Sequence, residues 1–221
     1  MMTIYICGDS ISASYGPDRA PMTGWGQLLS CYTGSVKVDN QAFPGRSARS
    51  FLNEGRLQKI EKELRPGDLM LIQFTHNDES PLLWRYAAPR TFFTDALTVY
   101  IDTAREYGAV PVLLTPVCMR NFVNGKLKNT HGDYPLAMEE LADKTGTACL
   151  DMYGFSFHQV QELGEEGSKN FFLHTDKGAY PAFPEGSSDN AHLKYTGADI
   201  LARWTAQELK ALKLIPEGKK K

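Results

Sequence analysis

The stretch Thr3-Ile4-Tyr5-Ile6-Cys7-Gly8-Asp9-Ser10 decides the fold and carries the first candidate for chemistry. Its first five residues are mostly β-branched or aromatic, which is typical of a buried strand, and a serine follows at the turn. A serine hydroxyl is a poor nucleophile at neutral pH, so it needs an imidazole to take its proton and a carboxylate to orient that imidazole. Asp189-Asn190-Ala191-His192 carries both groups, in chain order Ser, Asp, His.

Segments with strand and helix patterns alternate along the chain. Strands are predicted over residues 3–7, 36–40, 69–74, 110–115 and 148–152. Helices are predicted over residues 47–64, 91–107 and 133–144, and from Thr196, which has a capping-box partner in Asp199. This alternation is typical of a parallel sheet with crossover helices, so we expect an α/β fold with a five-stranded parallel sheet. The length of 221 residues and the hydrophobic content of 42% fit a single domain over residues 1–221.

Composition and charge exclude several classes of partner. Lys and Arg number 24 against 26 Asp and Glu, so there is no basic excess for a phosphate backbone and we expect no nucleic-acid partner. No apolar stretch approaches the roughly 20 residues of a spanning helix, so we expect no membrane partner. The first strand follows Met1 and Met2 without room for a signal peptide, which indicates a cytoplasmic protein. A chain from which a signal peptide had been removed would begin in the same way, and nothing in the residues indicates the oligomeric state.

The four cysteines, Cys7, Cys31, Cys118 and Cys149, are scattered along the chain. They have neither the paired spacing of a zinc site nor the pattern of a disulfide framework. Cys7 and Cys149 lie in strand-like runs, where a thiol usually packs as a small apolar side chain. We therefore expect reduced thiols. As a separate expectation, the protein needs no metal and no cofactor.

Three residues that are distant in the sequence are expected at one edge of the sheet. Ser10 follows the first strand, Gly45 the second and Asn77 the third, and ligands of open parallel sheets bind outside the carboxyl ends of the strands. The backbone N–H groups of Ser10 and Gly45 and the side-chain amide of Asn77 are candidates for an oxyanion hole. Taken one at a time, each residue has a simpler explanation. Ser10 would be a helix cap, Gly45 a turn glycine and His192 a surface histidine. Their matching positions favour a site with Ser10 as nucleophile, His192 as base and Asp189 as the orienting acid.

Four short motifs resemble sequence blocks of the SGNH (GDSL-type) hydrolases, in order and with natural spacing. They are Gly8-Asp9-Ser10, Gly45, Thr75-His76-Asn77-Asp78 and Asp189-Asn190-Ala191-His192. The resemblance runs from residue 3 to about residue 210. It implies a flavodoxin-like three-layer α/β/α sandwich, the three catalytic roles given above, and an oxyanion hole of Ser10, Gly45 and Asn77.

Further stretches resemble the rhamnogalacturonan acetylesterase branch of that family, which removes acetyl groups from pectic sugar chains without a metal. They are residues 23–27, 72–78, 114–117, 129–135 and 137–138. The resemblance implies a carbohydrate O-acetylesterase that hydrolyses acetyl esters of plant cell-wall pectic oligosaccharides, or of smaller molecules, through an acyl-serine intermediate. The alternatives are a lipase, thioesterase or lysophospholipase of the same family, and a non-catalytic carbohydrate-binding protein of the same fold.

One residue departs from the family pattern. The third block normally begins with glycine, and Thr75 stands there in this chain. A β-branched residue is costly where φ is positive, so Thr75 either takes an ordinary conformation or displaces the amide of Asn77. A third possibility is that its side chain protrudes into the acyl pocket and favours acetate.

Aromatic and basic side chains near the motifs are candidates for sugar contacts. Aromatic rings stack on sugars, and a guanidinium matches the carboxylate of a galacturonate, although packing and solvent exposure explain such residues equally well. The aromatic candidates are Trp25, Trp84, Tyr86 and Phe122, and the basic ones are Arg46, Arg85, Arg90 and Arg120. Residues 162–188, rich in glycine and aromatic residues, form either an ordered wall or a lid.

Overall fold

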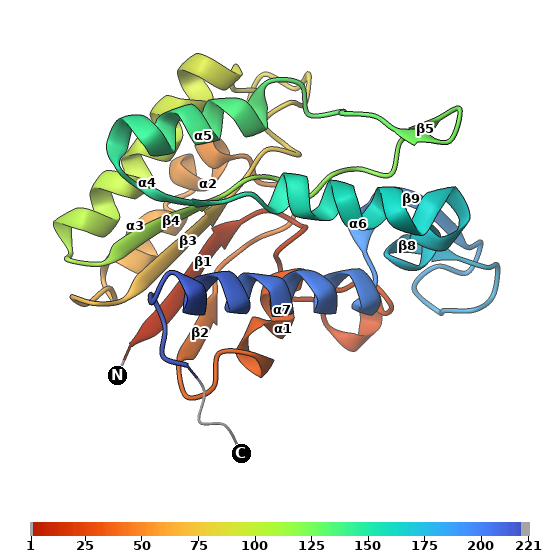
Figure 1. Cartoon of the computed structure of the whole chain (residues 1–221), viewed down its shortest axis with the longest axis horizontal. Helices are drawn as coiled ribbons and strands as arrows, with labels where there is room; N and C mark the ends of the chain where they lie inside the picture. Colours follow the sequence, from red (N-terminus) through yellow and green to blue (C-terminus); the bar gives the residue numbers. More distant parts are fainter. Residues whose placement is uncertain (1, 218–221) are drawn as a thin grey trace.

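The computed structural model describes residues 2–217 and has a five-stranded sheet as its central layer (Figure 1). The strands are β1 (Thr3–Gly8), β2 (Lys37–Asn40), β3 (Leu69–Gln73), β4 (Val110–Leu114) and β7 (Ala148–Leu150). Their order is β2-β1-β3-β4-β7 and every neighbouring pair is parallel. This is the flavodoxin-like order, with the first strand between the second and the third. The predicted five-stranded parallel sheet is confirmed.

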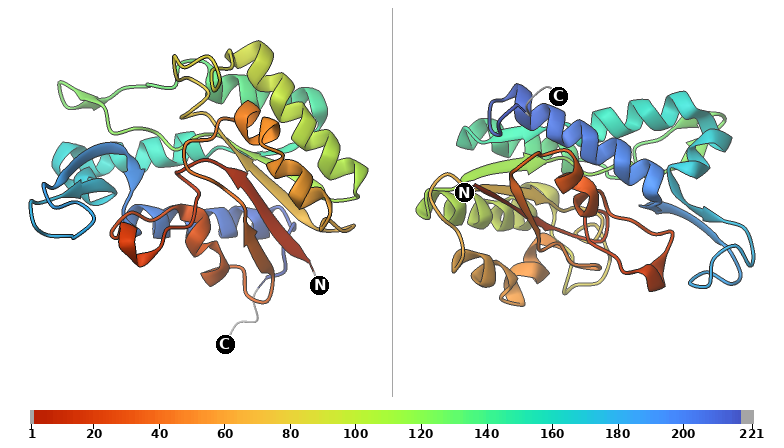
Figure 2. Two further views of the ribbon diagram at one scale, coloured as in Figure 1. Left: turned by 180° about the vertical axis from the view of Figure 1, so that it is seen from behind. Right: turned by 90° about the horizontal axis from the view of Figure 1, so that it is seen from below.

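Helices cover both faces of the sheet, so the three-layer α/β/α sandwich is also confirmed (Figure 2). Side chains alternate between the two faces of a strand, and Ile4 and Ile6 belong to one apolar cluster while Tyr5 and Cys7 belong to the other. The helices on the Tyr5 face are α2 (Ala48–Asn53), α3 (Arg56–Glu61), α4 (Thr94–Glu106) and α5 (Tyr134–Thr145). Those on the Ile4 face are α1 (Trp25–Leu28), α6 (Met152–Gly167) and α7 (Tyr195–Ala211).

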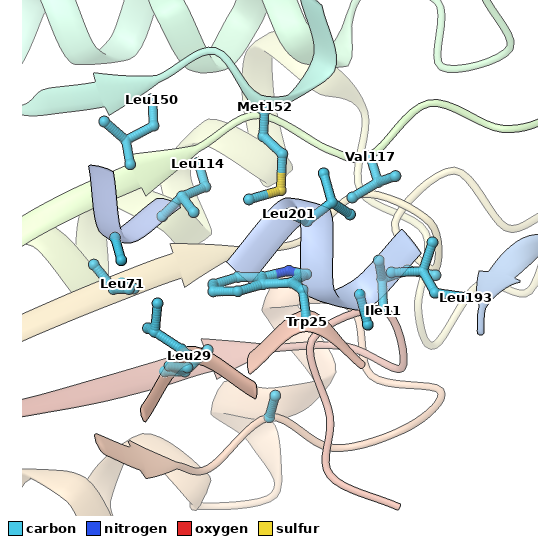
Figure 3. Packing of buried hydrophobic residues seen from close by; sticks show 14 of the residues in the cluster. Ile11, Trp25, Leu29, Leu71, Leu114, Val117, Leu150, Met152, Leu193 and Leu201 are labelled. Atoms are coloured by element: carbon cyan, nitrogen blue, oxygen red, sulfur yellow. The ribbon is translucent and has the colours of Figure 1, made fainter. Parts of the chain in front are cut away.

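Trp25, an aromatic candidate for sugar stacking, lies in the core instead. Its side chain is fully buried, and its indole N–H donates to Oε1 of Gln73 at 2.6 Å. Figure 3 shows the ring beside Leu201 and below Met152. The stretch around Trp25 is therefore explained by packing, because a Cβ on Gly24 or Gly26 would come within 2.1 or 2.5 Å of backbone oxygen atoms.

The predicted helix over residues 47–64 is wrong in one respect, because it is two helices. Ser47 caps α2, and Ser50 completes a capping box. Gly55 then takes a left-handed conformation with φ of 68°, which breaks the helix before α3 begins. The predicted helix over residues 91–107 corresponds to α4, preceded by the π-helical turn η3 (Pro89–Phe93), and the one over residues 133–144 to α5.

Other boundaries differ from the predictions as well, by one to three residues. The fifth strand ends at Leu150 rather than residue 152, because Asp151 caps α6 by accepting the N–H of Gly154 at 2.8 Å. The last helix, α7, begins at Tyr195, and Lys194 precedes it without a side-chain cap. The predicted capping box is therefore wrong, since the carboxylate of Asp199 accepts from Tyr32 and Arg203 instead.

Two antiparallel hairpins extend from the carboxyl edge of the sheet (Figure 1). One pairs β5 (Phe122–Val123) with β6 (Lys126–Leu127), and the other pairs β8 (Phe172–Thr175) with β9 (Ser187–Leu193). Residues 162–188 thus comprise the end of α6, the 3₁₀ turn η4 (Ser168–Asn170), β8 and the return to β9. Within residues 2–217, no helix combines the length and apolar character needed to cross a membrane.

Candidate active site

Ser10, His192 and Asp189 come together at the carboxyl edge of the sheet. Nε2 of His192 lies 3.0 Å from Oγ of Ser10, and Nδ1 of the same ring lies 2.7 Å from Oδ2 of Asp189. The imidazole therefore bridges the hydroxyl and the carboxylate. Such an arrangement can move a proton from the serine to the histidine while the carboxylate holds the ring in the required tautomer.

A bulge in β9 presents Asp189 and His192. Leu193 pairs with Phe172 and Ser188 with His174, so four residues of β9 stand opposite a single residue of β8. Inside the bulge, Oδ1 of Asp189 accepts the backbone N–H groups of residues 191 and 192 at 2.8 and 2.9 Å. The sequence predicted a loop or turn that folds the carboxylate onto the imidazole, and the bulge does this.

The bulge is anchored from outside through Asn190. The backbone oxygen of Asn190 accepts the N–H of Arg120 at 2.8 Å, and its side-chain oxygen accepts Nη1 of Arg120 at 3.2 Å. Arg120 is only 7% exposed and also donates from Nε to Oγ of Ser168 at 3.0 Å. Arg120, a sequence candidate for binding a sugar carboxylate, is therefore a buried support of the bulge.

Ser10 lies in the turn that follows β1. Oδ1 of Asp9 accepts the N–H of Ile11 at 2.9 Å, and the hydroxyl of Tyr15 donates to the backbone oxygen of Ser10 at 2.7 Å. Gln27 in turn binds the backbone of Tyr15 through both ends of its amide. Tyr15 was missed in the sequence, where the only signal was its distance of five residues from the serine.

The charges of the site favour a histidine that carries a proton readily. Burial lowers the pKa of His192, but the hydrogen bond and negative charge of Asp189 outweigh burial and raise the pKa above its ordinary value. Burial likewise raises the pKa of Asp189, but its bonds from His192 and from the backbone outweigh this and lower the pKa to about 2. Asp189 is therefore ionised at neutral pH.

The predicted oxyanion donors follow adjacent strands. Gly45 has φ of 79°, a conformation that favours glycine, and Asn77 is 7% exposed after β3. Nδ2 of Asn77 donates to the backbone oxygen of Arg46 at 3.2 Å, so the amide of Asn77 lies against the loop that contains Gly45. That loop lies beside β1, because the N–H of Phe43 donates to the oxygen of Gly8 at 3.0 Å.

Thr75 stands where the family pattern has glycine, and it has a positive φ. Its φ is 156°, its side chain is fully buried and its hydroxyl has no hydrogen-bond partner among residues 2–217. Because the side chain is fully buried, it does not line the open surface of an acyl pocket. Asn77 nonetheless keeps the two hydrogen bonds of its amide, to Arg46 and from Arg85.

A second group of titratable residues lies beneath the site. Burial raises the pKa of Asp9 to about 6, and its Oδ2 lies 3.7 Å from Nδ1 of His76. The ring of His76 packs edge-on against His131, with 4.6 Å between centroids, and Nδ1 of His131 lies 3.1 Å from Oε2 of Glu79. Within residues 2–217, no group of three or more His, Cys, Asp or Glu side chains is arranged to hold a metal ion.

A pocket of about 630 Å³ opens beside His192 and Asp189. Aromatic rings and two guanidinium groups line it, a combination that suits a sugar bearing carboxylates. The aromatic and basic residues of its lining are Tyr15, Arg19, Phe43, Arg46 and Phe183. Arg19 makes no salt bridge within residues 2–217, whereas Arg46 pairs with Glu54.

The sequence matches the GDSL-like lipase/acylhydrolase family over residues 6–200. The chain belongs to this family. The match includes Ser10, Gly45, Asn77, Asp189 and His192, the residues that the resemblance pointed to. Members of the GDSL-like family are named for ester and acyl hydrolysis, which agrees with the geometry of the serine and histidine.

Two relatives with named activities align with nearly the whole length of this chain. Rhamnogalacturonan acetylesterase RhgT of Bacillus subtilis is 38% identical over 213 residues, which are 96% of this chain and 90% of the relative. The probable rhamnogalacturonan acetylesterase YesY of the same organism is 36% identical over 96% of this chain and 94% of that relative.

Solved structures share the fold. The crystal structure of the Bacillus subtilis protein YxiM has a TM-score of 0.81 and 28% identity, over 96% of this chain and 57% of that one. Axe2, an acetylxylan esterase from Geobacillus stearothermophilus, has a TM-score of 0.67 and 16% identity over 94% of each chain. At 16% identity, the similarity to Axe2 concerns the fold alone.

The activity of this GDSL-like protein is expected to depend on pH through His192. Protonated His192 cannot accept the proton of Ser10. The value of kcat/KM should therefore rise with pH and level off above the pKa of His192 in the free enzyme. Because Asp189 raises that pKa, the midpoint should lie above the ordinary histidine value of about 6.5. A pH series of kcat/KM for 4-nitrophenyl acetate measures it, and a midpoint below the ordinary value would contradict the pairing of His192 with Asp189.

Proposed function

We propose that this protein is a carbohydrate O-acetylesterase that acts on pectic oligosaccharides of the rhamnogalacturonan type. The observation that carries the proposal is the histidine bridge, with His192 3.0 Å from the Ser10 hydroxyl and 2.7 Å from the Asp189 carboxylate. The two relatives named for rhamnogalacturonan deacetylation, at 38% and 36% identity, support the substrate. The role of each site residue is part of the proposal.

The proposed reaction has two halves. In the first, Oγ of Ser10 attacks the acetyl carbonyl while Nε2 of His192 takes the hydroxyl proton, and Gly45 and Asn77 donate to the negative oxygen with the N–H of Ser10. The tetrahedral species then breaks the ester bond, and His192 gives its proton to the departing sugar oxygen. In the second half, water attacks the acetyl-Ser10 ester, again with His192 as base, and acetate leaves.

The lining of the pocket supports the proposal that the leaving group is an acidic sugar. Arg19 lines the pocket near His192 and makes no salt bridge within residues 2–217, which leaves its guanidinium for a substrate carboxylate. Phe43 is exposed at the pocket, and the guanidinium groups of Arg46 and Arg56 lie over its ring at 4.5 and 3.7 Å from the centroid. Guanidinium and aromatic groups suit uronate-containing chains better than an acyl tail.

We expect the protein to prefer acetyl esters over long acyl esters. The measurement compares kcat/KM for 4-nitrophenyl acetate and 4-nitrophenyl octanoate, and the proposal predicts at least a tenfold preference for acetate, since one or two misfitted methylenes already change a rate by about tenfold. Acetate release from acetylated rhamnogalacturonan fragments should also exceed release from acetylated xylan.

The other outcomes identify the alternatives. A preference for octanoate would make the protein a lipase or thioesterase of the same family. Turnover of acetylated xylan alone would move the substrate to another polysaccharide. No turnover of any ester, together with no reaction of Ser10 with an organophosphonate, would make it a carbohydrate-binding protein.

A further inference from the structure

Arg85 contacts the side chain proposed as an oxyanion donor. Its Nη1 donates to Oδ1 of Asn77 at 2.8 Å, while Nδ2 of Asn77 donates to the backbone oxygen of Arg46 at 3.2 Å. We propose that Arg85 is a positioning residue of the oxyanion hole, which fixes and polarises the Asn77 amide so that the second Nδ2 hydrogen is presented to the reacting oxygen. This inference rests on the proposed ester hydrolysis.

The two contacts of Asn77 admit one orientation of its amide. A guanidinium only donates hydrogen bonds, and a carbonyl oxygen only accepts them. A reversed amide would set its NH₂ group against Arg85 and its oxygen against the oxygen of Arg46. Without Arg85, only the 3.2 Å contact to Arg46 would select the orientation that offers a donor to the substrate.

The charge of Arg85 also makes the amide a better donor. Hydrogen bonds from charged groups are roughly twice as strong as those between neutral groups, and bonds linked in a chain polarise one another. The positive charge pulls electron density toward Oδ1 and leaves the Nδ2 hydrogens more positive. The benefit is largest when the substrate oxygen becomes negative, so it should affect kcat more than KM.

The surroundings of Arg85 hold its guanidinium in place before substrate binds. Cζ of Arg85 lies 4.5 Å from the centroid of the Trp84 ring, within the range of a cation–π contact. The segment that carries both residues is tied to the third motif, because the N–H of Ala87 donates to the oxygen of Asp78 at 3.0 Å. Arg49 supports the same segment by donating to the oxygen of Leu83, and within residues 2–217 its side chain has no hydrogen bond to Asn77.

Arg85 was a sequence candidate for a substrate carboxylate, and the structure directs it to Asn77 instead. Arg90 has a protein partner as well, since it pairs with Asp133 and Glu140. Of the four arginines singled out in the sequence, Arg85 is the one whose side chain forms a hydrogen bond with a predicted site residue. Arg46 contacts Asn77 through its backbone oxygen. An arginine that binds an amide oxygen has no sequence signature.

A double-mutant cycle tests the inference. The variants are Arg85→Met, Asn77→Ala and the combination, assayed for kcat and KM on 4-nitrophenyl acetate. Asn77→Ala should lower kcat by about 10²- to 10³-fold, the usual effect of removing one oxyanion donor. Arg85→Met should lower kcat about 10- to 100-fold with KM within about threefold, and it should cost less than about threefold once Asn77 is absent.

A matched control separates positioning from support of the loop. Arg49→Met removes a guanidinium that holds the same segment and should keep kcat within about threefold. Arg85→Lys keeps a charged donor but loses the planar guanidinium over Trp84, so it should lose less activity than Arg85→Met. Equal losses for Arg85→Met with and without Asn77, no loss at all, or the same loss in Arg49→Met would overturn the inference. If Arg85→Met does not fold, Arg85→Gln is used in the same cycle. Lack of turnover by the unaltered protein would instead contradict the proposed function.

Discussion

Replacing Ser10 with alanine is expected to lower kcat for 4-nitrophenyl acetate by about 10⁶-fold, the scale of loss when a triad serine is removed. The hydroxyl of Ser10 makes its side-chain hydrogen bond to Nε2 of His192, and the backbone oxygen that binds Tyr15 is retained in the variant. The thermal midpoint should therefore change by only a few degrees. Steady-state kinetics and a melting curve measure the two effects.

Ser14 provides the matched control for this substitution. It lies four positions after Ser10, is exposed, and its hydroxyl accepts from Nδ2 of Asn40 at 3.0 Å. Ser14→Ala should leave kcat within about twofold, as expected for a surface change away from the site. Comparable activity in Ser10→Ala and the unaltered protein would show that another group attacks the ester.

Asp189→Asn should lower kcat by about 10⁴-fold, because the loss of the carboxylate favours the wrong tautomer of the histidine. Asparagine can present its NH₂ group to Nδ1 of His192, which then accepts, so that Nε2 carries the hydrogen and cannot take the proton of Ser10. The pKa of His192 should also fall, since the Asp189 charge raises it. The midpoint of the residual kcat/KM profile should therefore shift to lower pH.

Asp176→Asn is the control for this change, because Asp176 is exposed in the same hairpin. It should leave both kcat and the pH midpoint unchanged. If Asp189→Asn retained full activity with an unshifted midpoint, Asp189 would have no part in orienting His192.

The sheet and the central site residues were predictable because each has a local signature. Strands of a parallel sheet are buried on both faces and stand out as short apolar runs, as in residues 3–7 and 69–74. Positions directly after such strands converge by topology, which brought Ser10 and Asn77 to one edge. The pairing of Asp189 with His192 was predictable because they are three residues apart.

The remainder depends on contacts that leave no local pattern. The apolar spacing of residues 47–64 continues across the break at Gly55, so periodicity alone missed it. The apolar run of the fifth strand continues into α6, and the cap at Asp151 separates them. The hydroxyl of Tyr15 and the guanidinium of Arg85 reach the site by folding of loops, which no motif spacing encodes.

Labelling with an organophosphonate tests the central claim that His192 activates Ser10 as the nucleophile. The protein is treated with the reagent, digested, and the modified residue is located by mass spectrometry. One phosphonyl group should be found per chain, on Ser10, and both its formation and ester hydrolysis should be lost together in His192→Ala. Modification of a different residue, or full ester turnover in a protein whose Ser10 remains unmodified at saturating reagent, would contradict the account.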